Sequence, residues 1–165
     1  MRTFEDVAFN FDYLNYTNKI FFLKETIYNH LIHDNYMSAT MMIRNNPKEI
    51  FGYRQALVNI SNFLNNCISG ADVSREVGHA YISYTIIQFV RTCGQINNSN
   101  KKKIYKLIQE IINDSNVRDN LQFYSPTKGD SKILPILMKL KLYWPIIWVC
   151  KYKAYRRYGK GGSTR

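Results

Sequence analysis

Apolar residues recur every three or four positions over most of the chain between residues 53 and 113. The stretches that keep this spacing are residues 53–68, 73–92 and 101–113, and each predicts a helix. Residues 73–92 carry apolar side chains around much of the circumference, so this helix should be mostly buried. With 45% hydrophobic and 15% aromatic residues, the chain can form a packed core.

The N-terminal region combines a helix pattern with a strand pattern. Glu5 and Asp6 open a run of apolar residues at helical spacing, which predicts a helix over residues 4–16. Residues 19–23 and 26–32 are rich in Ile, Phe and Tyr and predict two short strands or a hairpin. The expected fold is therefore mainly α with a short β-hairpin near the N-terminus.

The C-terminal segment, residues 131–165, holds most of the excess positive charge. The chain has 23 Lys and Arg against 12 Asp and Glu, a net charge of +11, and no acidic residue follows Asp130. Aliphatic residues, Trp and Tyr alternate with the cations, while Pro135 and Pro145 interrupt the apolar run. This mixture predicts a segment that lies at the surface of an anionic membrane. The alternative is a core helix followed by a solvated basic end.

The residues expected to contact the membrane are the two tryptophans and the cations that follow them. They are Trp144, Trp148, Lys151, Lys153, Arg156 and Arg157. No stretch of about 18 uncharged apolar residues predicts a spanning helix, and the N-terminus has no secretory signal pattern. Three cysteines without a CxxC pair fit a reducing compartment. We therefore expect a cytoplasmic protein, peripheral on the cytoplasmic face of the membrane.

Few residues suggest chemistry of their own. The common nucleotide-binding and metal-binding motifs are absent, including Asp-x-Asp, so we expect no metal and no cofactor in this chain. Glu5 and Asp6 form a carboxylate pair at a helix start, which is compatible with capping or with catalysis. His79 fits a buried structural role better than a ligand role. Residues 101–103, all Lys, are a solvated helix start or part of a surface for anionic lipid or nucleic acid.

The order of the N-terminal motifs adds information. Residues 4–10 (FEDVAFN) precede a helix, and residues 19–23 (KIFFL), 27–30 (IYNH) and 38–40 (SAT) follow in that order. This arrangement resembles the second half of bacterial family two glycosyltransferases. The specific part of the resemblance covers about residues 2–41, and the basic, Tyr-rich end of the chain is similar in general character to the ends of such enzymes.

The resemblance implies a fold and a division into three parts. The fold would be the C-terminal part of a GT-A α/β glycosyltransferase followed by a helical bundle. Residues 1–45 would end the catalytic domain, residues 46–130 would form the helical bundle, and residues 131–165 would be a basic, amphipathic, membrane-associated tail.

The implied activity is sugar transfer, with inversion, from a nucleotide-diphosphate donor to a growing surface polysaccharide or lipopolysaccharide. Asp6 would be the general base that deprotonates the acceptor hydroxyl, and Glu5 would orient the acceptor or the base. Tyr28, His30 and Ser38 would contact the acceptor, which is a glycan or is linked to a lipid.

The family's nucleotide-binding half, with its Asp-x-Asp motif and Mg or Mn ion, has no counterpart in these residues. We therefore expect this chain to be inactive alone and to need a complementing N-terminal half. The alternative function is a non-enzymatic basic module for a membrane surface or for nucleic acid. Nucleic acid is disfavoured because the cations lie in an apolar segment.

Overall fold

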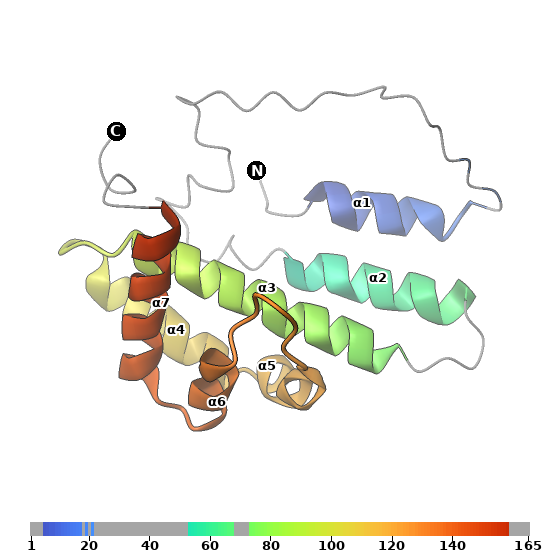
Figure 1. Cartoon of the computed structure of the whole chain (residues 1–165). Coiled ribbons are helices and arrows are strands. Elements are labelled where there is room, and N and C mark those ends of the chain that lie inside the picture. The colour runs from blue at the N-terminus through green and yellow to red at the C-terminus, as the bar shows by residue number, and fades with distance from the viewer. Residues whose placement is uncertain (1–4, 18, 20, 22–52, 68–72, 159–165) are drawn as a thin grey trace.

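The computed structural model describes residues 5–17, 19, 21, 53–67 and 73–158, and the regular elements of this part are all helices (Figure 1). Their order along the chain is α1 (Glu5–Leu14), α2 (Tyr53–Cys67), α3 (Ser74–Gly94), α4 (Lys101–Asn113), α5 (Ser115–Asn120), the 3-10 helix η2 (Leu121–Phe123), α6 (Ile133–Lys139) and α7 (Tyr143–Tyr158). The helices predicted over residues 4–16, 53–68, 73–92 and 101–113 are confirmed as α1 to α4.

The expected GT-A α/β glycosyltransferase fold is wrong. No strand occurs in the part of the chain that the structure describes, and α1 packs on a helix rather than on a sheet. The Phe11 and Phe63 rings meet edge to face with centroids 5.6 Å apart, and Asn59 Nδ2 on α2 donates to the carbonyl oxygen of Ala8 at 3.0 Å. The predicted hairpin segment, apart from Lys19 and Phe21, lies outside the described residues.

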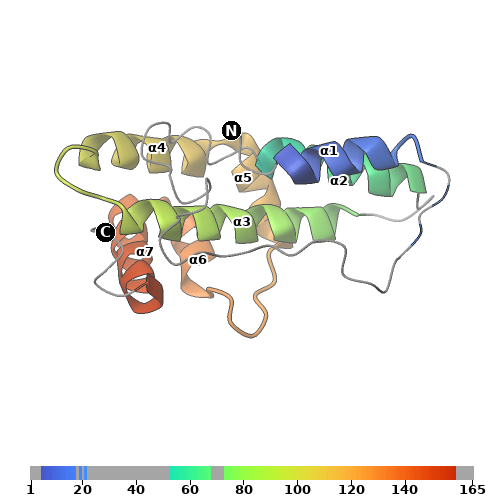
Figure 2. The ribbon, with the colours of Figure 1, turned by 90° about the horizontal axis from the view of Figure 1, so that it is seen from above.

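Helix α3 is the centre of the fold. Seen from above, α4 lies on one side of α3, while α6 and α7 lie on the other (Figure 2). It also contacts α2, α5 and η2. Because neighbours surround it, α3 buries residues on most of its circumference, including the polar Thr85 and Gln88. The predicted burial of this helix is therefore confirmed.

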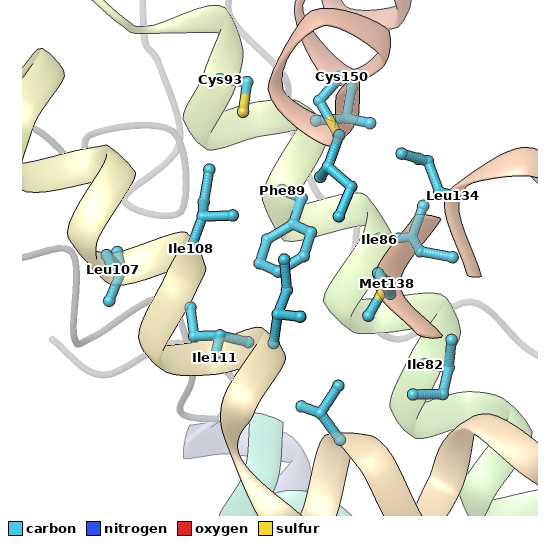
Figure 3. Packing of buried hydrophobic residues seen from close by; sticks show 14 of the residues in the cluster. Ile82, Ile86, Phe89, Cys93, Leu107, Ile108, Ile111, Leu134, Met138 and Cys150 are labelled. Carbon is cyan, nitrogen blue, oxygen red and sulfur yellow. The ribbon is translucent and has the colours of Figure 1, made fainter. Parts of the chain in front are cut away.

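The hydrophobic core joins α3 to the helices around it (Figure 3). Phe89, only 1% exposed, lies among aliphatic side chains of α3, α4 and α6. The labelled members of this cluster are Ile82, Ile86, Phe89, Cys93, Leu107, Ile108, Ile111, Leu134, Met138 and Cys150. Burying one such aliphatic or aromatic side chain stabilises a fold by about 1.5–3 kcal/mol. The core therefore extends from α2 into the C-terminal helix α7.

Two polar contacts fix α2 against this core. The Tyr53 hydroxyl forms a 2.7 Å hydrogen bond with Thr85 on α3, and burial raises the pKa of Tyr53. Arg54 makes a 3.1 Å ion pair with Asp114, whose other carboxylate oxygen accepts from the Asn116 backbone N–H and so caps α5. These contacts tie α2 both to the central helix and to the start of α5.

A tight turn ends α6 and directs the chain into α7. Lys141 adopts a left-handed conformation with φ of 55°. The backbone N–H of Lys141 donates to the carbonyl oxygen of Met138, and the backbone N–H of Leu142 donates to the carbonyl oxygen of Leu137. These two hydrogen bonds form a Schellman motif. Pro145 is the third residue of α7, where a missing N–H costs no helical hydrogen bond. The proline thus lies in the first turn of a helix instead of interrupting one.

Candidate functional site

Helix α7 has one face in the core. Ile146, Ile147, Cys150 and Ala154 are all buried, and their spacing places them on one side of the helix. They pack against α3 so closely that a Cβ at Gly94 would lie 2.9 Å from the Cβ of Ala154. A hydrogen bond with Cys93, together with burial, raises the pKa of the Cys150 thiol, so this thiol stays protonated. The buried face therefore holds α7 in one orientation.

The opposite side of α7 carries four aromatic residues, which we call the aromatic stripe: Trp144, Trp148, Tyr152 and Tyr155. All four are more than half exposed, and Trp148 reaches 74%. Their spacing of four, four and three residues aligns them along a single helix face. Soluble proteins rarely expose so many large aromatic side chains together. The stripe is therefore a candidate contact surface.

Exposed aliphatic side chains precede the stripe along the chain. Ile133 and Ile136 on α6, and Leu140 and Leu142 in the turn to α7, are all more than 40% exposed. They alternate with Lys132, Lys139 and Lys141, which are exposed as well. Apolar and cationic side chains thus mix on the surface of α6, of the turn and of α7.

Cations lie along both edges of the aromatic stripe. Lys151 follows Trp148 by three residues and precedes Tyr155 by four, which places it on one edge. Arg156 follows Tyr152 by four and lies on the other edge. Since no acidic residue follows Asp130 in the sequence, no carboxylate of α6 or α7 offsets this charge.

Two pockets flank α7. The first, which we call the α4 pocket, measures about 260 Å³ and lies between the start of α4 and the stripe, with Lys101, Tyr105, Trp144, Trp148 and Lys151 among its lining residues. The second, the loop pocket, measures about 680 Å³ and lies between α3, the loop at residues 124–131 and the C-terminal end of α7. Lys153, Arg156 and Arg157 line this second pocket.

An ionised carboxylate reduces the positive charge of the loop pocket. Asp130 lines it and accepts hydrogen bonds from the backbone N–H and the hydroxyl of Thr127, at 2.8 and 2.7 Å. These bonds lower the pKa of Asp130, so it is ionised at neutral pH. The α4 pocket has no acidic lining residue.

The sequence-predicted membrane residues therefore fall into two groups. Trp144 and Trp148 belong to the stripe, with Lys151 on its edge, while Lys153 and Arg157 line the loop pocket and Arg156 lies both at the stripe's other edge and in that pocket. Tyr152 and Tyr155 were not singled out from the sequence, although their spacing from Trp148 places them on the same face. Lys101 and Tyr105 lie more than 35 residues before the start of α7 in the sequence, so only the fold brings them to it.

The side chains predicted for sugar transfer lie outside the part of the chain that the structure describes. Glu5 and Asp6 occupy the first turn of α1, but their side chains lie outside the described residues, as do Tyr28, His30 and Ser38. Among the residues that are described, no cluster of three His, Cys, Asp or Glu side chains is arranged to hold a metal ion.

None of the helices in the described ranges is long and apolar enough to cross a membrane. Comparison of the chain with protein-family models, with curated proteins and with solved structures finds no match.

Proposed function

We propose that α6 and α7 bind the protein peripherally to the surface of an anionic membrane. The observation that carries this proposal is the aromatic stripe with cations along both edges. Trp and Tyr side chains favour the headgroup region of a bilayer, where the ring is partly immersed and the polar N–H or O–H stays hydrated. Each Lys or Arg near an anionic surface adds about 1 kcal/mol of attraction at physiological ionic strength.

The aliphatic residues favour a membrane over single-stranded nucleic acid. Nucleic-acid grooves use aromatic rings as stacking platforms together with cations, and the aromatic stripe alone would satisfy that description. Ile133, Ile136 and Leu140 offer no such platform, yet each is more than half exposed, and exposed lysines alternate with them along the chain. A bilayer interface accepts both kinds of side chain.

Vesicle flotation tests the proposal directly. The whole chain should float with vesicles of phosphatidylglycerol and phosphatidylcholine, bind pure phosphatidylcholine weakly, and lose affinity as salt rises. Lys151→Gln combined with Arg156→Gln should reduce binding about thirtyfold, because two surface charges are removed at roughly 1 kcal/mol each.

A matched control removes two cations elsewhere. Arg75 and Arg118 are exposed and lie on α3 and α5, so replacing both by Gln should reduce binding far less. Equal losses in the two double variants would show that net charge alone drives binding. Tighter binding to a single-stranded RNA oligonucleotide than to the vesicles would refute the membrane proposal.

Sugar transfer stays a prediction that rests on the resemblance of residues 2–41. The fold that this resemblance implied is wrong, and the side chain of Asp6 lies outside the described residues. The prediction is tested by Asp6→Asn in a preparation reconstituted with a complementing nucleotide-binding half. Transfer should be abolished while vesicle binding is retained, and persistent transfer would remove Asp6 as the base.

A further inference from the structure

Two lysines and three aromatic residues line the α4 pocket. Lys101 comes from the first turn of α4 and Lys151 from α7, while Tyr105, Trp144 and Trp148 supply the rings. Asn97 and Asn98 from the loop between α3 and α4 complete its polar lining. Since no lining residue is acidic, the pocket suits an anion.

Several contacts hold the walls of this pocket in place. The Tyr105 ring meets the Trp144 ring edge to face, with centroids 4.8 Å apart and an interplanar angle of 83°. Lys101 Nζ lies 5.6 Å from the centroid of the Tyr105 ring, within the range of a cation–π interaction. Because these contacts already restrict the side chains, ligand binding costs less side-chain entropy.

The adjoining loop is ordered by its own hydrogen bonds. The side-chain oxygen of Asn97 accepts from the backbone N–H groups of Ser99 and Asn100, each at 3.0 Å. The Asn100 side chain in turn donates to the carbonyl of Gln95 at 2.9 Å. The rim of the pocket is thus formed before any ligand arrives.

The pocket adjoins the aromatic stripe, because Trp144 and Trp148 belong to both. When the stripe lies at headgroup depth, as in the proposed function on which this step rests, the pocket lies at the level of the lipid phosphates. Its position therefore makes lipid headgroups available to it.

We propose that the α4 pocket binds a phosphomonoester, with Lys101 and Lys151 as its cationic partners. A phosphomonoester carries a charge of about −1.5 to −2 and three terminal oxygens. The phosphodiester of phosphatidylglycerol has a single charge and only two free oxygens. Two ammonium groups, each with three donors, match the monoester better. In a membrane its source is the headgroup of phosphatidic acid, and in solution it is a compound such as glycerol 3-phosphate.

The test compares vesicles that contain phosphatidic acid with vesicles that contain phosphatidylglycerol, brought to equal zeta potential. Lys101→Gln should reduce binding to the phosphatidic acid vesicles about tenfold, as expected for one charge-assisted hydrogen bond. Lys102→Gln is the matched control, because it removes the same charge from the neighbouring exposed residue, which does not line the pocket. On phosphatidylglycerol the two variants should behave alike.

A soluble arm separates the two sources of the phosphate. Titration of the whole chain with glycerol 3-phosphate, followed by phosphorus NMR, should show line broadening that Lys101→Gln weakens and Lys102→Gln does not. Broadening with no preference for phosphatidic acid vesicles would assign the pocket to soluble phosphomonoesters.

Failure of this inference can be told apart from failure of the membrane proposal. If both vesicle types bind equally, both Lys variants match, and the soluble probe shows no Lys101-dependent broadening, the phosphomonoester site is refuted and membrane binding stands. If neither vesicle type binds, membrane binding is refuted, and the soluble titration alone decides the pocket's ligand.

Discussion

Replacing Trp148 by Ala should sharply weaken binding to anionic vesicles. Trp148 lies in the middle of the aromatic stripe and is 74% exposed in the free protein. Since a Trp side chain can bury up to about 250 Å², this exposure leaves roughly 185 Å² available to a bilayer. At about 25 cal/mol per Å², full immersion would be worth roughly 4.6 kcal/mol. A ring at headgroup depth is only partly immersed, so we expect a loss of about 2 kcal/mol, or about thirtyfold in the partition coefficient.

The partition coefficient can be measured by flotation on mixed phosphatidylglycerol and phosphatidylcholine vesicles, with the emission of Trp144 as a second readout. Phe9→Ala is the control, because Phe9 is a comparably exposed aromatic residue, 69%, on the distant helix α1. This control should bind within about a factor of two of the unchanged chain. Since Trp148 contributes little to the core, thermal unfolding should hardly change.

The reasoning fails if Trp148→Ala partitions like the unchanged chain, because the stripe would then not enter the interface. It also fails if Phe9→Ala loses as much affinity as Trp148→Ala. In that case exposed aromatic area anywhere on the molecule would drive binding, and the position of the stripe would not matter.

Three further predictions test the fold. Gly78→Ala would place a Cβ 2.7–2.8 Å from side-chain atoms of Phe123 and Asn120. Urea unfolding should therefore show that the variant is destabilised by about 1–3 kcal/mol. Unchanged stability would contradict the packing of η2 on α3. Lys141→Gly should stabilise the chain by about 0.5–1 kcal/mol in the same assay, because glycine adopts the positive φ without strain. A loss of stability would exclude the Schellman turn. A maleimide should label exposed Cys67 in the native chain, and it should label the buried thiols of Cys93 and Cys150 only in denaturant. Rapid labelling of all three cysteines in the native chain would refute the docking of α7 on α3.

The helices with a buried face could be predicted from residue spacing. The prediction for residues 101–113 coincides with α4, and that for residues 53–68 agrees with α2 over the described residues, Tyr53–Cys67. These helices pack one apolar side against the core, and such packing requires the three-to-four-residue spacing that the sequence displays. For these helices, the spacing of apolar residues in the sequence therefore matches the face that is buried in the fold.

The fold class could not be predicted in the same way. A short run rich in Ile, Phe and Tyr satisfies the patterns of both a strand and a buried helix. The α/β assignment came from the resemblance of residues 2–41 to a glycosyltransferase family, whereas α1 packs on α2 through the contact of Phe11 with Phe63. No local pattern around Phe11 reveals a partner more than 50 residues away.

The candidate site was predicted only where a single helix carries it. The aromatic stripe lies within residues 144–155, and the cations at its edges are close in sequence, so composition and spacing can indicate it. The α4 pocket needs Tyr105 against Trp144, and that contact exists only because α4 and α7 pack together. Long-range packing of this kind leaves no signature in the spacing of either segment.

The C-terminal segment was predicted to lie at a membrane surface or to be a core helix followed by a solvated basic end, and α7 has both a buried and an exposed face. Its buried face packs on α3 through Ile146, Cys150 and Ala154, and its other face presents the aromatic stripe. A free amphipathic tail would lose conformational entropy when it folded at a membrane, whereas α7 is already helical and fixed in direction. In the proposed membrane binding, the core contacts would therefore raise the affinity without touching lipid, because they remove that ordering cost. They also hold Trp144 beside Tyr105, so the proposal treats the stripe and the α4 pocket as one rigid surface.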